Sequence, residues 1–350
     1  MLNLDLSNRT LIVYLQDHLR SINGKTGLAV LRYSPHPIAA IIDTEYAGRS
    51  LFEVTGIARE VPIVASLEEA IAQGGDTLLI GLSPSGGRLT GHHREVVTTA
   101  ISAGLSVING LHDRLNHLNP HITGAQEIFD IRVPPPECLV VGFGRAQSLP
   151  NQRILTVGTD MAIGKMSTCI EFHVAATKRN MLSTFFATGQ TGIVIAGRGI
   201  PLDAVPVDFA SGAVEYGVIT LSTGDCEWLW IEGQGSMLNP ASTATLPLIR
   251  GSQPTGLVLV HRAGQTSVKN NPAFPIPPLK EVVAFYESVV KAAGTFPAAP
   301  VRAIALNTAD LSLDDALAYI HLIERETGRP TDDVVRFGAD RLLNAIIENR

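Results

Sequence analysis

The sequence predicts an α/β protein with two doubly wound domains, each built on a mainly parallel sheet. With 350 residues the chain is too long for one small domain, and with 45% hydrophobic residues it can bury two cores. Short continuous runs of Val, Ile and Leu, typical of strands buried on both faces, alternate with amphipathic segments typical of helices. This alternation indicates parallel strands joined by helices that cover the sheet.

The predicted elements follow one another along the whole chain. The strands are the brief apolar runs at 38–43, 77–82, 105–110, 153–158, 183–188, 228–233, 256–261 and 301–307. The helices are the segments at 66–74, 92–104, 165–178 and 312–328. Ser66 and Ser312 precede their helices with an acidic residue three positions later, which is close to a capping box. Helix stops follow at Gly74, Gly104 and Gly328.

A domain boundary is expected near the middle of the chain. Residues 133–137 (VPPPE) are stiff and cannot continue a helix, and residues 146–152 (AQSLPNQ) are polar and turn-prone. We therefore expect an N-terminal α/β domain over residues 1–148 and a second domain over residues 149–350.

Charge and cysteine usage exclude several classes of partner. Charged residues make up 17% of the chain and the net charge is −6, which argues against a nucleic-acid partner. Cys138, Cys169 and Cys226 lie far apart, so we expect neither a disulfide framework nor a metal site. The N-terminus lacks a signal-peptide pattern, and no apolar stretch is long enough for a membrane span. We expect a soluble cytoplasmic protein with a small-molecule substrate, and its apolar surfaces favour a homo-oligomer.

The clearest chemical signal is the segment 158–168 (GTDMAIGKMST), between a predicted strand and a predicted helix. A glycine-bracketed turn at such a junction points backbone N–H groups and a helix N-terminus at an anion. Lys165 adds a cation that can reach a phosphate. The predicted cofactor-binding residues, which include an amide at the end of a later strand, are Gly158, Thr159, Asp160, Gly164, Lys165, Ser167, Thr168 and Asn307.

This segment departs from the common P-loop pattern. Residues 159–163 separate its two glycines, one residue more than in the pattern, and Met166 stands where a hydroxyl residue usually follows the lysine. Ser167 comes one position later, and one residue turns a helix by about 100°. The usual Mg²⁺ ligand is therefore displaced or missing. We expect phosphate binding but not Mg²⁺-dependent cleavage of a nucleotide.

A second group of candidates follows the apolar run 228–231, where Glu232 is followed by Gly233 and Gly235. A carboxylate at a strand end beside a phosphate loop can orient a metal or act as a base, and glycines let a ligand approach the backbone. The alternative is a Glu232 that only pairs with an arginine at the strand end. His261, which ends another predicted strand, is either a general base or a structural histidine.

Asp208 and Glu215 lie about two helical turns apart, so on a helix they would share one face and could flank a substrate amine. The alternative is an N-cap and a solvated acid. Asn307 either contacts the base ring of a ligand or is structural.

In the N-terminal domain, polar segments follow the predicted strands at Asp43, at 83–91 and at 109–115. They converge on the carboxyl edge of a sheet, where such folds bind ligands, or serve turn geometry alone. No GxGxxG motif is present, so a dinucleotide cofactor is not supported. A further GKT at 24–26 has no apolar strand leading directly into it, and we interpret it as a loop.

The chain resembles a bacterial family of unknown function with a Rossmann-like N-terminal domain and a P-loop C-terminal domain. Besides residues 158–168, the resemblance is carried by TGQTGIVIAGRGIPLDAVPVDF at 188–209, WIEGQGS at 230–236 and LVLVHRAGQT at 257–266. Strings such as IIDTEYAGRS at 41–50, PIVASLEEA at 62–70, LLIGLSPSGGRL at 78–89 and INGLHDRL at 108–115 extend it over nearly the whole chain. The C-terminal half also resembles dethiobiotin synthetase, which has Thr after the lysine where this chain has Met166.

The family resemblance implies a D-glutamate N-acetyltransferase that uses acetyl-CoA, whose phosphates a P-loop can hold without Mg²⁺. Amide formation needs a base for the amine, for which the catalytic candidates are Glu232, His261 and Asp208. It also needs donors for the developing oxyanion, which the N–H groups of 233–236 can supply. The substrate-binding candidates are Gln190, Thr191, Arg198, Gln234, Gly235, Ser236 and Arg262, with Arg250 as a further cation for a dicarboxylate.

Other functions fit the same residues. The likeness to dethiobiotin synthetase implies a ligase or kinase that uses ATP with Mg²⁺ on a small carboxylate, and Met166 counts against it. A non-catalytic nucleotide-binding protein would need no basic group beside the loop.

Overall fold

The computed structural model describes residues 1–84, 86–89, 91–118, 122 and 125–348. Within the polar segment predicted at 83–91, Ser85 and Thr90 lie outside the described residues. The chain forms two compact units. The N-terminal unit comprises Leu2–Pro134 and Gln190–Pro201, and the C-terminal unit comprises Met1, Pro135–Gly189 and Leu202–Arg350.

The N-terminal unit is built on a sheet of six parallel strands in the order β4-β3-β2-β5-β6-β7. This is the strand order of the Rossmann fold, with the reversal point between β2 and β5. The strands are β2 (Leu11–Tyr14), β3 (Ile38–Ile42), β4 (Ile63–Val64), β5 (Thr77–Ile80), β6 (Ser106–Asn109) and β7 (Ile128–Asp130).

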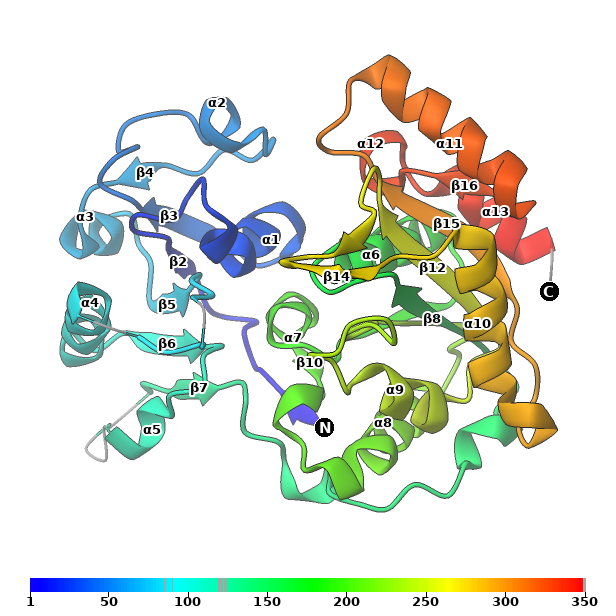
Figure 1. Ribbon diagram of the computed structural model, residues 1–350. Coiled ribbons are helices and arrows are strands. Elements are labelled where there is room, and N and C mark those ends of the chain that lie inside the picture. The colour runs from blue at the N-terminus through cyan, green and yellow to red at the C-terminus, as the bar shows by residue number, and fades with distance from the viewer. Residues whose placement is uncertain (85, 90, 119–121, 123–124, 349–350) are drawn as a thin grey trace. The chain divides into compact units, whose positions relative to one another are not determined.

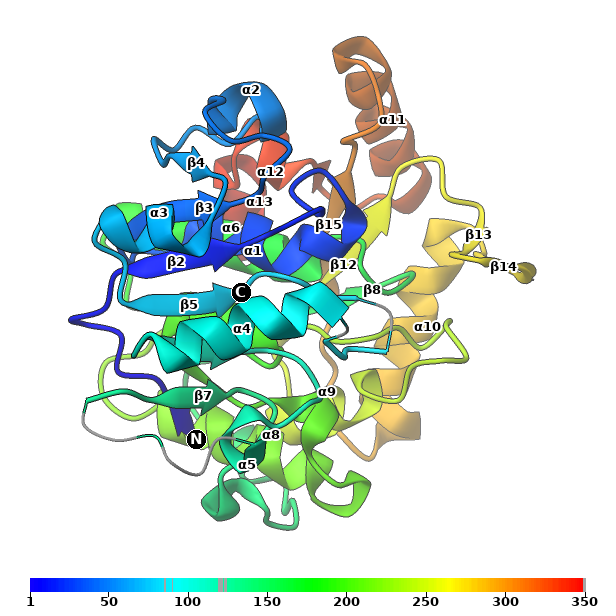
Figure 2. The same cartoon turned by 90° about the vertical axis from the view of Figure 1, so that its left-hand side faces the viewer.

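Helices and a short ribbon complete the N-terminal unit. The helices are α1 (Lys25–Tyr33), α2 (Leu51–Thr55), α3 (Leu67–Ala72), α4 (Gly91–Ser102), α5 (Leu115–Leu118) and α7 (Gln190–Ala196). Figure 2 faces α4, which lies along β5 and β6. The antiparallel pair β1 (Leu2–Asn3) and β10 (Arg198–Gly199) ties the segment 190–201 to the start of the chain.

The C-terminal unit has a second sheet of six parallel strands, in the order β16-β15-β12-β8-β11-β9. They are β8 (Gln152–Gly158), β9 (Ser183–Phe186), β11 (Trp228–Ile231), β12 (Gly256–Arg262), β15 (Val301–Asn307) and β16 (Thr331–Asp332). The antiparallel hairpin of β13 (Ser267–Val268) and β14 (Asn271–Pro275) follows β12. The sheet places β8, which leads into the P-loop, between β11 and β12.

Helices cover both faces of this second sheet, as Figure 1 shows. On one face lie α6 (Lys165–Lys178), α12 (Val334–Phe337) and α13 (Asp340–Glu348). Against the other lie α8 (Val207–Leu221), α9 (Thr245–Ser252), α10 (Leu279–Lys291) and α11 (Leu313–Thr327). With the first sheet, this arrangement confirms the expected α/β class with two parallel-sheet domains.

The core beside the P-loop is aromatic. Trp228 and Trp230 are fully buried on β11, where their rings stack with centroids 5.8 Å apart. Trp230 also stacks on Phe172 of α6 at 5.0 Å and donates from Nε1 to the Ser183 hydroxyl at 3.0 Å. Because large buried rings contribute strongly to stability and pack specifically, this stack fixes β11 and with it the residue that follows the strand.

The sequence predicts most of these elements and misses some. Every predicted strand is confirmed. The two predicted N-caps are confirmed as well, since Ser66 Oγ accepts from the Glu69 N–H at 3.2 Å and Ser312 Oγ accepts from the Asp315 N–H at 3.1 Å. The loop interpretation of residues 24–26 is wrong, because Lys25 begins α1 after the unpredicted strand β2. The expected boundary at residue 148 falls inside the C-terminal unit, which begins its main segment at Pro135.

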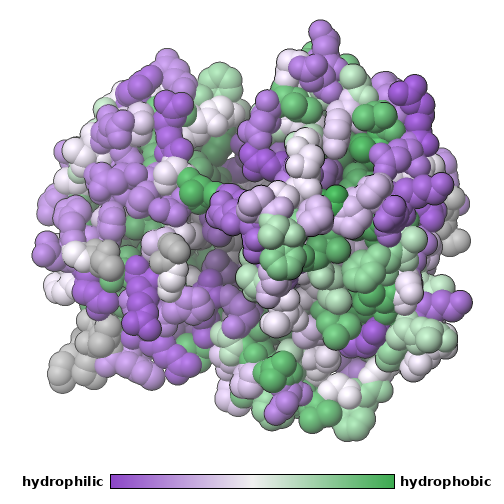
Figure 3. All heavy atoms as spheres, in the orientation of Figure 1, coloured by the Kyte–Doolittle hydropathy of each residue, from purple (hydrophilic) through white to green (hydrophobic). Residues whose placement is uncertain are grey.

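The surface differs between the two units on the face drawn in Figure 3. Hydrophilic residues cover most of the N-terminal unit there, whereas apolar residues are interspersed over the C-terminal unit. In the part of the chain that the structure describes, no helix is both long and apolar enough to cross a membrane.

Candidate active site

The P-loop lies at the carboxyl end of β8, in the middle of the C-terminal sheet. β8 ends at Gly158 and α6 begins at Lys165, as the sequence predicts. Gly164 has φ +115°, a conformation that favours glycine, and turns the loop into the helix. Among the described residues, no protein acceptor takes up the backbone N–H groups of 162–165. These N–H groups and the uncapped start of α6 fit an anion such as a phosphate.

Lys165 lies under the loop and is only 6% exposed. Its Nζ donates to the main-chain oxygen of Asp160 at 2.6 Å. Burial lowers the pKa of Lys165 to about 8, although the charges of Asp160 and Glu232 act in the opposite direction. Because this pKa stays above neutrality, the ammonium group is mostly charged at pH 7 and can pair with a phosphate.

The carboxylate of Asp160 is engaged within the protein. Oδ1 accepts from the Met161 N–H and from Asn239 Nδ2, both at 2.7 Å. Oδ2 accepts from Gln265 Nε2 at 2.6 Å and from the Lys269 N–H at 2.7 Å. Burial raises the pKa of Asp160, but these four donors outweigh burial and hold it below its usual value. Asp160 thus ties the P-loop to the hairpin β13–β14.

Glu232 follows β11 directly and is 3% exposed. Its Oε2 accepts from the N–H groups of Thr188 (2.8 Å) and Gly189 (3.1 Å), and its Oε1 accepts from Gln234 Nε2 at 3.1 Å. Burial raises the pKa of Glu232 to about 7, and the two N–H donors and the charge of Lys165 limit that rise. No arginine pairs with Glu232 among the described residues, so this carboxyl group can change its charge near neutral pH.

The backbone just after this carboxylate is packed tightly against β8. A Cβ on Gly233 would lie 1.8 Å from the main-chain oxygen of Thr156, so only glycine fits there. The Gly233 N–H donates to Thr156 Oγ1 at 2.8 Å, and the Ser236 N–H donates to Ser242 Oγ at 3.0 Å. Of the predicted oxyanion donors, the N–H groups of 234–235 have no acceptor within the described chain and remain free for a ligand.

His261 lies near the end of β12, and its side chain is buried beside the P-loop. Its Nδ1 shares a hydrogen bond with the Thr159 hydroxyl at 2.9 Å, and its Nε2 lies 3.5 Å from the Tyr319 hydroxyl. The ring is 2% exposed, and burial lowers the pKa of His261 to about 4. The histidine is therefore neutral at pH 7, and its contacts position Thr159.

The remaining loop candidates lie where the sequence places them. Asn307 Nδ2 donates to the main-chain oxygen of Ile163 at 3.1 Å, so its amide supports the P-loop. Thr168 is 4% exposed, and its N–H donates to the oxygen of Gly164 at 2.9 Å. Ser167 is half-buried in the first turn of α6. Within the described residues, no three His, Cys, Asp or Glu side chains are grouped to hold a metal ion.

Asp208 and Glu215 both lie on α8 but in different surroundings. Asp208 is exposed in the first turn, after the N-cap residue Pro206. Glu215 is buried, accepts from the N–H groups of Phe143 and Arg145, and pairs with the Arg145 guanidinium at 2.7 Å. The interpretation of this pair as an N-cap and a solvated acid is therefore wrong.

Three substrate-binding candidates belong to the N-terminal unit. Gln190 and Thr191 begin α7, and Arg198 is exposed in β10. The Thr191 hydroxyl shares a hydrogen bond with the Thr26 hydroxyl at 3.0 Å, and Thr26 in turn contacts the Ser83 hydroxyl at 2.6 Å. Gln190, Thr191 and Arg198 thus belong to the compact unit built on the Rossmann sheet and not to the one that holds the P-loop.

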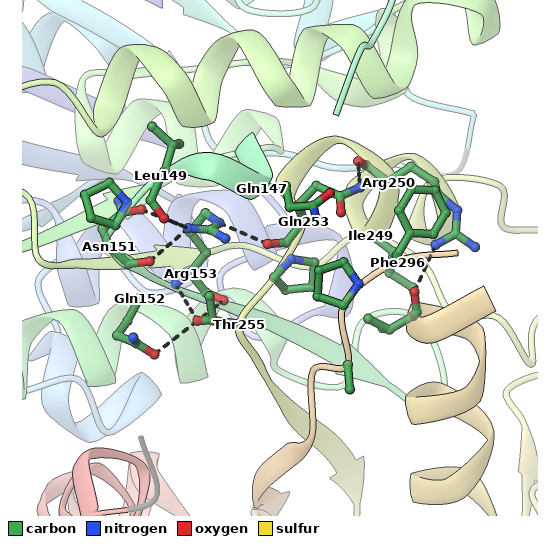
Figure 4. Close-up of a pocket in the computed structure, with 15 residues that line it drawn as sticks. Gln147, Leu149, Asn151, Gln152, Arg153, Ile249, Arg250, Gln253, Thr255 and Phe296 are labelled. Atoms are coloured by element: carbon green, nitrogen blue, oxygen red, sulfur yellow. Dashed lines mark hydrogen bonds between the residues drawn. The ribbon is translucent and has the colours of Figure 1, made fainter. Parts of the chain in front are cut away.

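The candidate arginines of the C-terminal unit are engaged elsewhere. Arg262 forms an ion pair with Asp310, with Nε at 3.0 Å from the carboxylate. Arg250 lies near the amino ends of the strands, where with the buried Arg153 it lines a cavity of about 240 Å³ (Figure 4). Its guanidinium lies 4.5 Å from the centre of the Phe296 ring and donates to main-chain oxygens of α10. Arg250 is therefore remote from the P-loop.

Several contacts around the site escape sequence reasoning. The hydroxyls of Tyr286 (2.7 Å) and Ser236 (2.8 Å) both donate to the main-chain oxygen of Gly158, which fixes the entry to the loop. The two backbone donors to Glu232 are the N–H groups of Thr188 and Gly189, which follow a different strand. The sequence analysis predicts no helix over residues 279–291, and the signal for Tyr286 is a polar aromatic residue among the apolar positions of that segment.

Comparisons with known proteins agree with this arrangement. Residues 140–343 match the family model described as "Domain of unknown function (DUF1611_C) P-loop domain", and residues 44–134 match that of the "DUF1611_N" Rossmann-like domain. A crystal structure of a DUF1611 family protein from Anabaena variabilis ATCC 29413 is 52% identical, covers 98% of this chain and 100% of its own, and superposes with a TM-score of 0.94.

Two curated relatives carry an enzyme name. A D-glutamate N-acetyltransferase from Tritonibacter scottomollicae is 35% identical over 80% of this chain and 84% of its own length. A second protein of that name, from a Pseudoalteromonas species, is 31% identical over 79% of this chain and 83% of its own length. With both domain models matched in their expected order, this chain belongs to the DUF1611 family.

Proposed function

We propose that this protein is an N-acetyltransferase that transfers the acetyl group of acetyl-CoA to the amino group of D-glutamate. The observation that carries this is the similarity, over 80% and 79% of the chain, to two proteins named D-glutamate N-acetyltransferase. The surroundings of the P-loop support it with a group suited to each step of amide formation.

The loop itself fits the diphosphate of coenzyme A. The N–H groups of 162–165 have no acceptor in the described part of the chain, and Lys165 supplies a buried cation beside them. When bound, acetyl-CoA supplies an acyl carbon activated as a thioester. The carboxylate of Asp160, the acidic residue of the loop, accepts from four other donors. It therefore does not compete with the phosphates for the N–H groups of 162–165.

Glu232 is the base in this proposal. It accepts one proton from the substrate's ammonium group, which frees the amine lone pair for attack; the N–C bond then forms, the C–S bond breaks, and the second proton lost by the nitrogen goes to the leaving thiolate. A base with a pKa of about 7 is well matched to neutral pH. A carboxylate offers about four acceptor positions, and protein donors use three of them, so one remains for the amine.

The charge that develops on the acyl oxygen needs donors that are already in place. The N–H groups of 234–235 are the available candidates, because those of Gly233 and Ser236 are used within the fold. Lys165 adds a positive charge close to the same carboxylate. These groups let the site stabilise an oxyanion without a metal ion.

The test is an assay of the purified protein with acetyl-CoA and D-glutamate in excess EDTA. We expect equimolar release of free thiol and formation of N-acetyl-D-glutamate, identified by mass, at a rate unchanged by EDTA. A parallel reaction holds ATP and Mg²⁺ in place of acetyl-CoA. ADP formation in that reaction, without acetyl transfer in the first, would refute the acetyltransferase and support a ligase.

A further inference from the structure

A cavity of about 390 Å³ lies beside the P-loop, between the loop and the segment that follows β12. Its walls include Met161 and Ile163 from the loop and Gln265, Val268, Lys269 and Asn271 from the hairpin segment. Figure 2 shows this hairpin projecting beyond the end of β12. The volume lies in the range of small-molecule binding sites, and the walls combine apolar and polar side chains.

The two walls of this cavity are fixed to each other. Asp160 in the loop accepts from the Lys269 N–H at 2.7 Å and from Gln265 Nε2 at 2.6 Å, so one buried carboxylate holds both sides. A ligand bound to the P-loop therefore has a preformed pocket next to it.

The cavity carries one uncompensated charge. Arg262 is neutralised by Asp310, and the carboxylate of Asp160 is surrounded by donors. The side chain of Lys269 is exposed and forms no ion pair within the described residues. The pocket should therefore attract an anionic group to Lys269.

The cavity wall also holds an acceptor without a donor. Gln265 Nε2 contacts two oxygens, Asp160 Oδ2 and the main-chain oxygen of Ser267 (2.9 Å), which fixes the orientation of the amide. The opposite atom, Gln265 Oε1, is buried and has no hydrogen-bond partner among the described residues. A buried acceptor is unfavourable when it is left unpaired, and an N–H group of a ligand can satisfy it.

We propose that this pocket binds the adenosine 3′-phosphate end of coenzyme A, with Lys269 contacting the 3′-phosphate and the adenine amino group reaching Gln265. This rests on the proposed function, in which the P-loop holds the diphosphate of the same molecule, and it adds the means by which the site distinguishes coenzyme A from nucleotides without a 3′-phosphate. A carboxylate of D-glutamate would also be drawn to Lys269. The volume and the apolar wall formed by Met161, Ile163 and Val268 favour a nucleoside.

The test is calorimetric titration of the full chain with CoA and with 3′-dephospho-CoA. The variants are Lys269→Gln and, as a matched control with the same loss of charge, Lys280→Gln on the exposed surface of α10. The Lys269 side chain is exposed and its backbone N–H is kept, so folding should be unaffected. We expect Lys269→Gln to weaken CoA binding about fivefold, the value of an exposed charged contact, and to leave 3′-dephospho-CoA and the control unchanged.

The outcomes separate this pocket from the proposed activity. Equal weakening for both ligands, no weakening for either, or no CoA binding at all would overturn the assignment of the pocket. A rise in the KM for D-glutamate alone would assign Lys269 to the acceptor and overturn it as well. If Lys269→Gln weakens binding of CoA but not of 3′-dephospho-CoA, and the protein transfers no acetyl group, the pocket is upheld and the acetyltransferase is refuted. If the protein transfers acetyl groups but Lys269→Gln does not distinguish the two ligands, the acetyltransferase is upheld and the pocket is refuted.

Discussion

At the scale of single residues, the site depends on two carboxyl groups, those of Asp160 and Glu232, which are both buried but differ in the direction of their pKa shifts. Four donors hold the pKa of Asp160 below its usual value, whereas burial raises the pKa of Glu232 to about 7. Groups whose pKa values are moved apart by their surroundings commonly divide the roles in a catalytic site. Asp160 accordingly anchors the P-loop, and Glu232 is left to exchange a proton.

His261 is expected to affect stability and positioning more than proton transfer. Above pH 6.5 the histidine is neutral in both folded and unfolded chains, but as the pH falls towards about 4 only the unfolded chain binds the proton. The folded state of the wild type should therefore lose about 2 kcal/mol between pH 7.5 and pH 5 that a His261→Gln variant does not lose. Urea unfolding at the two pH values measures this difference. A variant with an unchanged pH dependence but turnover reduced by about 100-fold would instead make His261 a base.

At the scale of elements, the close approach of β11 and β8 determines where Glu232 lies. The Cβ of an alanine at position 233 would lie 1.8 Å from a main-chain oxygen of β8, which cannot move without disturbing the centre of the sheet. Gly233→Ala should lower the free energy of unfolding by about 3 kcal/mol. Gly264→Ala is the comparison, because Gly264 has φ +76° with nothing within 4 Å of its Cβ position, and should cost only about 1 kcal/mol. Equal costs in urea unfolding would contradict this account of the contact.

The sequence predicts five of the six strands of the C-terminal sheet because each is a largely apolar run, and the P-loop joins one of them to a helix; it misses β16, which is short and polar (Thr331–Asp332). It misses β2, since Leu11–Tyr14 is short and separated from the GKT at 24–26 by a polar segment. Glu232 is predictable from its strand, but its donors at 188 and 189 are not, because parallel strands bring distant segments together. The assignment of residues 190–201 to the N-terminal unit likewise depends on non-local packing, above all the pairing of β1 with β10.

At the scale of the whole molecule, the apolar surface of the C-terminal unit leads us to propose a homo-oligomer. Val207 and Phe143 are 79% and 78% exposed, although exposed apolar side chains of this size are unfavourable in water. Light scattering of the purified protein should give a mass that is a multiple of the single chain. The mass of one chain across a range of concentrations would contradict the proposal.

Both units contain residues predicted for binding, and the central chemical group of the P-loop unit is Glu232. The most direct measurement is kcat/KM for acetyl transfer from acetyl-CoA to D-glutamate, in EDTA, for the wild type and for Glu232→Gln as a function of pH. The wild-type value should rise through about pH 7 as Glu232 ionises, and the variant should be at least about 100-fold slower and lack that rise, with near-normal folding. A variant with wild-type turnover and the same pH profile would contradict the account and place the base elsewhere.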